Sequence, residues 1–171
     1  MKYFDFVMSE VHGLRIQELM DAKKQGRKVI GSYCVFVPEE LILAVDGVSV
    51  GLCAGAEFNF EGAEALLPRN TCSLIKSMFG FKLGKVCPYL EASDVVVGEN
   101  TCDGKKKAYE MLAPLVKDLH IMDMPQMKTP MGKALLKEEY RKLITKLEAT
   151  SGKKITVESL KKGIDITNAK R

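Results

Sequence analysis

Four short runs of apolar, strand-favouring residues alternate along the chain with segments of helical pattern. The runs lie at residues 28–36, 48–53, 94–98 and 118–122, and each contains valine, isoleucine or both. Runs of this length, bounded by glycine, proline or polar residues, are typical of buried strands. Because parallel strands need long crossover connections, strands that alternate with helices favour a parallel sheet. The sequence therefore predicts an α/β domain with a mostly parallel sheet of about four strands.

The segments between and around these runs carry helix signals. Pro38 at a first helical position, followed by Glu39 and Glu40, is typical of a helix start, and Gly152 is typical of a helix end. The predicted helices lie at 4–24, 38–44, 57–67, 71–79, 102–112, 128–151 and 157–164. We expect two parts, a cysteine-bearing α/β domain at 1–125 and a helical extension at 126–171.

Composition limits the class of protein. With 171 residues, of which 46% are hydrophobic, the chain can fill one core and carry a helical appendage. No window reaches the roughly 18 apolar residues of a membrane-spanning helix, and acids interrupt the first residues where a signal peptide would be apolar. We therefore expect a soluble, cytoplasmic protein that is not bound to membranes. The net charge of +4 comes from scattered lysines, so solvated basic faces are favoured over nucleic-acid binding.

Five cysteines form the main candidate for chemistry. An odd number in a reducing compartment disfavours a disulfide framework, which leaves metal or redox chemistry, or five small buried side chains. On the predicted fold, Cys34 lies near the end of the first strand, Cys53 ends the second, and Cys102 follows the third at a helix start. In open parallel sheets ligands bind beyond the carboxyl ends of the strands. Three thiols would share that edge, which favours metal ligation.

The other two cysteines add to this hypothesis. Cys72 stands at another predicted helix start and Cys87 precedes Pro88 in a predicted loop. A helix N-terminus favours a thiolate, which is the form that binds metal. Ligation by sulfur alone suits zinc or an iron–sulfur cluster. Successive cysteines lie 19, 19, 15 and 15 residues apart, unlike the paired cysteines of a zinc ribbon, so such a site would be assembled from distant loops.

Other motifs are weaker candidates. Residues 98–105 resemble a phosphate-binding loop, but the glycine spacing is one residue too long and Lys106 replaces the expected serine or threonine. Glu39 is a candidate for catalytic acid–base work near Cys34, and the alternative is a charge placed favourably at a helix start. His12 has no second ligand-type residue one turn away on its predicted helix, and His120, in a predicted strand, has no better claim to a metal.

Several segments with these cysteines resemble one known family. They are GSYCVFVPEELI at 31–42, LC at 52–53, LPRNTCSLIKS at 67–77, CP at 87–88 and VGENTCDGKKK at 97–107. In this order they resemble the 2-hydroxyacyl-CoA dehydratase component D family, which also includes benzoyl-CoA reductase subunits and double-cubane cluster proteins. The family usually has proline where this chain has Ser73 and threonine where it has Asn100, and neither change affects a thiol.

The resemblance implies a two-domain protein with Rossmann-like (flavodoxin-like) halves that hold an iron–sulfur cluster, of the 4Fe-4S or double-cubane type, between them. It implies Cys72, Cys102 and Cys34 as the main cluster ligands, with Cys87 and Cys53 as weaker ones. An ATP-hydrolysing iron–sulfur activator would supply electrons for reduction or dehydration of an acyl-CoA thioester. The chain would then be one component of a lyase or reductase, acting as a homodimer or heterodimer.

The resemblance also implies a second domain, which would follow the helical extension at 126–171. The alternative is a module that binds a partner or dimerises through its C-terminal helices without a cluster.

Overall fold

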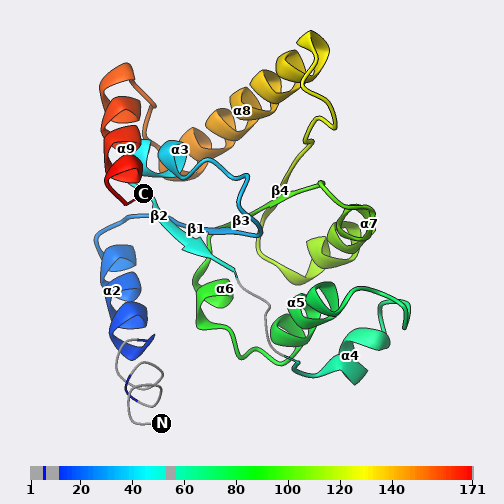
Figure 1. Cartoon of the computed structure of the whole chain (residues 1–171). Coiled ribbons are helices and arrows are strands. Elements are labelled where there is room, and N and C mark those ends of the chain that lie inside the picture. The colour runs from blue at the N-terminus through cyan, green and yellow to red at the C-terminus, as the bar shows by residue number, and fades with distance from the viewer. Residues whose placement is uncertain (1–5, 7–11, 53–56, 171) are drawn as a thin grey trace.

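A computed structural model describes residue 6 and residues 12–52 and 57–170. Its centre is a sheet of four parallel strands in the order β2-β1-β3-β4 (Figure 1). The strands are β1 (Val29–Ser32), β2 (Val48–Gly51), β3 (Val95–Glu99) and β4 (Leu119–Met122). Their carboxyl ends all meet at one edge because the strands are parallel. The chain direction across the sheet reverses between β1 and β3, where ligands commonly bind in open α/β sheets.

One face of the sheet is covered by the helices that connect β2 to β3 and β3 to β4 (Figure 1). These are α4 (Phe60–Glu64), α5 (Ser73–Leu83), α6 (Pro88–Ala92) and α7 (Asp103–Leu112), which leads into a 3-10 turn, η2 (Ala113–Leu115). Val96 of β3 packs against this layer with Phe79 and Leu112, which are fully buried. The helix α2 (His12–Lys24) precedes β1 and packs beside α6.

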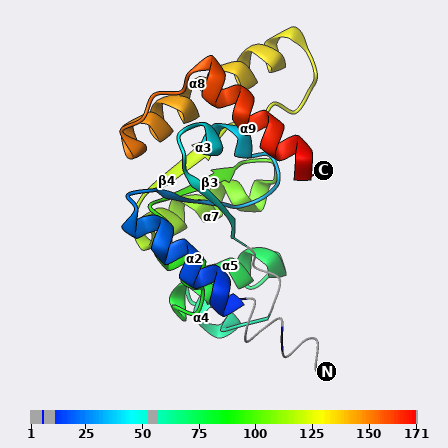
Figure 2. The ribbon, with the colours of Figure 1, turned by 90° about the vertical axis from the view of Figure 1, so that its left-hand side faces the viewer.

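The opposite face is covered by α3 (Glu39–Ala44), α8 (Pro130–Ser151) and α9 (Val157–Lys170), as Figure 2 shows from the side. Val95 and Val97 point to this layer, since successive residues of a strand face opposite sides of the sheet. Leu143 and Leu147 of α8 are fully buried against them. α8 is therefore packed onto the sheet through an apolar core, and α9 belongs to the same layer through its contact with α3.

α9 packs on α3 through the face that carries Gly163 and Thr167, which are its buried residues. A Cβ atom on Gly163 would come within 2.5 Å of the backbone oxygen of Glu40. Only a glycine fits there without displacement, so the two helices approach each other backbone to backbone. Thr167, one turn further along α9, is also buried, and its hydroxyl donates to the oxygen of Gly163.

The predicted α/β class and parallel sheet are confirmed, and every predicted strand is present. Several bounds differ, and three differences bear on the site and its surroundings. The first strand ends at Ser32, where the sequence predicted strand to residue 36, because the chain turns at Cys34. Cys87 caps α6, which the sequence reasoning missed although proline at a first helical position indicates a helix. The helix predicted at 57–67 is reduced to α4.

Parts of two predicted elements, residues 4–5 and 7–11 of the first helix and Cys53 of the second strand, lie outside the described residues. The division at residue 125 stays a prediction.

Candidate functional site

Cys34 lies on the turn that follows β1. Its φ angle is 78°, in the left-handed region that residues other than glycine rarely adopt. The register explains its neighbours, because Ser32 is paired with Val97 and the amide of Tyr33 donates to the oxygen of Val97 at 2.9 Å. Cys34 lies two residues after Ser32, and Glu99 lies two residues after Val97 at the end of β3. Cys34 and Glu99 are therefore neighbours. The thiol is exposed.

Three further cysteines occupy the N-caps of helices. Cys102 caps α7, and its sulfur accepts a hydrogen bond from the amide of Lys105 at 3.4 Å. Cys87 caps α6 in the same way, through the amide of Leu90 at 3.4 Å. Cys72 caps α5 without a side-chain bond. Backbone amides at a helix N-terminus favour negative charge, so these caps suit sulfur atoms that act as anionic ligands.

The starts of α5 and α7 lie side by side. A Cβ atom on Gly104 would come within 2.7 Å of the side chain of Ile75. Gly104 is two residues after Cys102 and Ile75 is three residues after Cys72. The two caps therefore belong to neighbouring helix ends, and both thiols are exposed.

The structure does not assemble a complete metal site from these thiols. Over residues 12–52 and 57–170, no three histidine, cysteine, aspartate or glutamate side chains are arranged to hold a metal ion. Cys34, Cys72, Cys87 and Cys102 are free thiols, and Cys53 lies outside the described residues. Free thiolate donors suit iron–sulfur ligation in their chemistry. Ligation by them stays a prediction.

A charged network lies under the Cys34 turn. Glu99 is fully buried at the end of β3 and forms an ion pair with Lys105 of α7. The second carboxylate oxygen accepts the amide of Thr101 at 2.8 Å, and the ammonium of Lys105 also donates to the hydroxyl of Thr101 at 3.3 Å.

The pKa values of this pair reflect their contacts. Burial alone would raise the pKa of Glu99, but Lys105, Thr101 and Cys34 together hold it below its ordinary value. Burial likewise opposes the charge on Lys105, and Glu99 and Cys34 nevertheless raise its pKa. Both groups are therefore charged at neutral pH.

Tyr109 extends the network into the core. Its side chain is 3% exposed, and its hydroxyl has no hydrogen-bond partner among the described residues. Burial raises the pKa of Tyr109 to about 12. The ring lies against Gly98, where a Cβ atom would come within 2.5 Å of it. The glycine before Glu99 thus leaves room for a neutral phenol beneath the charged pair.

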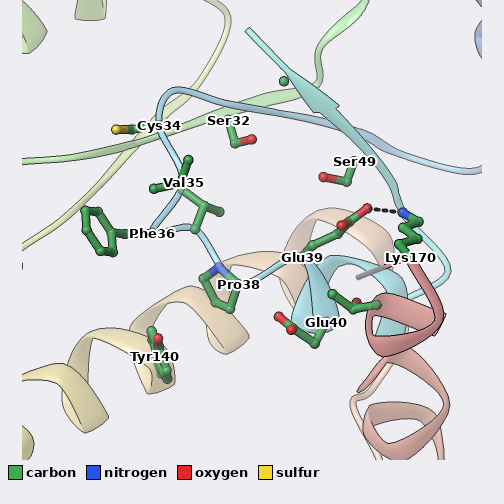
Figure 3. Close-up of a pocket in the computed structure, with 13 residues that line it drawn as sticks. Ser32, Cys34, Val35, Phe36, Pro38, Glu39, Glu40, Ser49, Tyr140 and Lys170 are labelled. Carbon is green, nitrogen blue, oxygen red and sulfur yellow. Dashed lines mark hydrogen bonds and ion pairs between the residues drawn. The ribbon is translucent and has the colours of Figure 1, made fainter. Parts of the chain in front are cut away.

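An open pocket of about 620 Å³ lies beside the Cys34 turn, at the carboxyl ends of β1 and β2 (Figure 3). Ser32 at the end of β1 and Ser49 within β2 contribute hydroxyls, and Val35 and Phe36 contribute an apolar wall. Tyr140 of α8 also lines the pocket. The pocket combines polar strand residues with an apolar side, which is typical of small-molecule sites.

Glu39, the predicted acid–base residue, lines this pocket at the start of α3. Its carboxylate forms an ion pair with Lys170 of α9 at 2.6 Å, drawn as the dashed line in Figure 3. The Cys34 thiol points away from that pair in the same view. The structure thus brings Glu39 and Cys34 to one pocket on opposite sides, and the catalytic role of Glu39 stays a prediction.

The sequence reasoning missed Glu99, Lys105 and Tyr109. One signal was available, since Glu99 ends an all-apolar strand and an acid in that position needs a partner when it is buried. The identity of the partner could not be read from the sequence, because it depends on how α7 lies against β3.

The fold and site define an α/β protein with free thiols at helix caps and at a turn beyond the carboxyl ends of a parallel sheet. Residues 34–171 match the family described as 2-hydroxyglutaryl-CoA dehydratase, D-component. The chain belongs to this family, as the resemblance of its cysteine motifs implied.

Two curated relatives support the assignment. The chain is 41% identical over 164 residues to a protein of Escherichia coli (strain K12) named "Putative dehydratase subunit YjiM", covering 95% of this chain and 43% of the relative. It is 29% identical over 173 residues to the (R)-phenyllactyl-CoA dehydratase beta subunit of Clostridium sporogenes, covering 99% of this chain and 45% of the relative. The chain spans less than half the length of both.

Among the described residues, no helix combines the length and the apolar character needed to cross a membrane.

Proposed function

We propose that this chain is a cluster-binding part of a 2-hydroxyacyl-CoA dehydratase-type component. Cys72, Cys102 and Cys34 would be the main thiolate ligands of an iron–sulfur cluster, of the 4Fe-4S or double-cubane type, and Cys87 and Cys53 would be weaker ones. When bound, the cluster would supply low-potential electron transfer. The observation that carries the proposal is the pair of exposed thiols on neighbouring helix caps, Cys72 and Cys102.

The residues of the chain would position the cluster and its substrate. The amide of Lys105 donates to Cys102, and the turn after β1 presents Cys34 from the neighbouring strand. The pocket beside that turn could take the acyl part of a thioester against Val35 and Phe36. Glu39 at its far side is a candidate to exchange a proton with the substrate.

The remaining ligands would come from outside the described residues. The two relatives are more than twice as long as the segment they share with this chain. We propose that the α/β part at 1–125 and the helices at 126–171 lead to a second domain that supplies the opposite wall of the site. An ATP-hydrolysing activator would deliver electrons, acyl-CoA would be the substrate, and the assembly would be a homodimer or heterodimer in the cytoplasm.

Anaerobic reconstitution with iron and sulfide tests the proposal. The chain is treated alone and together with the separately expressed remaining half of a relative, and bound iron and sulfide are measured with the absorption spectrum. Cys72→Ser and Cys102→Ser should each lower bound iron and weaken the charge-transfer absorption of the cluster. Asp103→Asn is the matched control, because this neighbouring side chain is fully exposed.

Sub-stoichiometric iron under both conditions, unaffected by the cysteine substitutions, would overturn the proposal. A stable oligomer with no iron would instead favour the alternative of a partner-binding module without a cluster.

A further inference from the structure

The pocket beside β1 and β2 has an apolar part that is open to solvent. Val35 and Phe36 line it, and they are 85% and 48% exposed. Tyr140 of α8 adds an aromatic ring to the lining. Apolar side chains that line a pocket and are exposed favour a ligand that removes them from water. A hydrocarbon group of a ligand would therefore be stabilised in this part of the pocket.

The charged side chains of the pocket come from the start of α3 and the end of α9. Among the described residues that line the pocket, Lys170 is the one cation, and Glu39 and Glu40 are the acids. The ammonium of Lys170 donates to the carboxylate of Glu39 at 2.6 Å (Figure 3). The lining thus carries more negative than positive charge, and its cation already has an anionic partner.

The packing of α9 supports this ion pair. Gly163, Thr167 and Lys170 recur at helical spacing, so they lie on one face of α9. Gly163 lies against the backbone of Glu40, and Thr167 is buried and lines the pocket. Glu39 and Glu40 are the first two residues of α3. The close approach of the two helices therefore brings Lys170 to Glu39.

A carboxylate on the ligand would have to compete for Lys170. If the ammonium left Glu39 for the ligand, one ion pair would replace another, and the Glu39 carboxylate would lose its partner. The ligand would then add a negative charge to a pocket that already has two acids, and like charges at short range repel each other. An uncharged hydrocarbon group displaces no ion pair and covers the apolar lining.

We propose that this pocket selects 2-hydroxyacyl groups with an uncharged, apolar side chain and disfavours those that carry a second carboxylate, because Glu39 neutralises Lys170. That the ligand is an acyl thioester rests on the proposed function. Lys170 is then a specificity-determining residue, and Glu39 determines whether it is available. The selectivity comes from side chains of this chain, and it requires no cluster.

The test is the binding of two probes of the same shape to the full chain of 171 residues. Both probes are 2-hydroxyacyl thioesters of N-acetylcysteamine. One has a 3-methylbutyl side chain, and the other has a 2-carboxyethyl side chain, in which two carboxylate oxygens replace the two methyl groups. Titration followed by nuclear magnetic resonance gives the two dissociation constants. The methylbutyl probe should bind roughly tenfold more tightly, which is the effect of one hydrogen bond to a charged group.

Glu39→Gln tests the cause of the preference. The substitution leaves Lys170 without its anionic partner, so the carboxylate probe should bind roughly tenfold more tightly than it does to the unmodified chain. The methylbutyl probe should be unaffected. The double variant Glu39→Gln/Lys170→Met should lose the gain, and Phe36→Ala should weaken binding of the methylbutyl probe several-fold. Glu138→Gln is the matched control and should change neither constant, because Glu138 pairs with Arg141 on an exposed face of α8.

Three results would overturn the inference. They are a carboxylate probe that binds as tightly as the methylbutyl probe, a Glu39→Gln chain with an unaltered preference, and no binding of either probe. Iron bound after anaerobic reconstitution is measured separately. Selective binding without bound iron would support the selectivity of the pocket and reject the proposed function. Bound iron without selectivity would do the reverse.

Discussion

Gly163→Ala should loosen α9 from α3. The new Cβ atom would lie 2.5 Å from the oxygen and 3.3 Å from the carbon of the Glu40 carbonyl. Both are backbone atoms of a buried helix, so they cannot move aside as a flexible side chain would. The two helices must therefore separate by several tenths of an ångström.

The magnitude follows from two opposing effects. Overpacking of this kind destabilises by about 1–3 kcal/mol. Alanine is a better helix former than glycine by about 1 kcal/mol, which offsets part of the loss. We expect a net decrease of up to about 2 kcal/mol in the free energy of unfolding, or a fall in Tm of up to roughly 8 °C for a chain of this size.

Gly13→Ala is the matched control. Gly13 lies in α2, and a Cβ atom there would meet nothing within 4 Å. The same substitution should therefore raise the free energy of unfolding by roughly 0.5–1 kcal/mol. Urea titration followed by circular dichroism measures both variants. A Gly163→Ala protein as stable as Gly13→Ala would refute the close approach of α9 to α3.

Two further perturbations test the core and its pH dependence. Leu143→Ala, which removes a fully buried side chain of α8, should lower the free energy of unfolding by about 2–5 kcal/mol; a loss within the error of a urea titration would show that α8 does not pack on the sheet. Burial lowers the pKa of His120 below 6.5, against an opposing effect of Glu139 and with a further lowering by Lys146. His120 of the unfolded chain therefore takes up a proton at a higher pH than His120 of the folded chain. The free energy of unfolding has its full value above pH 6.5 and declines as pH falls through that value toward the pKa of the folded state. His120→Gln should flatten this part of the curve of unfolding free energy against pH, and an unchanged slope would contradict the assignment to His120.

Much of the fold could be predicted because local signals agree with the tertiary structure. The valines of β3 are buried on both faces, and the short apolar run they form has the length of a strand. Gly152 ends α8 with a left-handed φ of 72°, as its place after the helical pattern indicated. The extent of β1 could not be predicted, because Tyr33 to Phe36 are apolar enough for a strand and only the tertiary structure turns the chain there.

The sequence predicted which elements carry the site residues, but it did not predict which residues contact one another. Cys34 and Cys102 were assigned to the carboxyl edge from their positions at the ends of predicted parallel strands. Their neighbours depend on the pairing of Ser32 with Val97 and on the start of α7. Neither follows from spacing in the sequence. The packing of α9 on α3 was also missed, because its determinant is a single glycine inside a helical pattern.

The left-handed turn at Cys34 also determines how this protein should respond to directed evolution. Glycine would adopt that backbone conformation without strain, and relief of such strain is worth about 1 kcal/mol. A library selected only for heat resistance should therefore enrich Cys34→Gly, a gain in Tm obtained by deleting a thiol. A cysteine at a position where glycine would be less strained indicates that the thiol is needed for its chemistry. Selections on this scaffold therefore need an assay that depends on the thiol as well as one for stability.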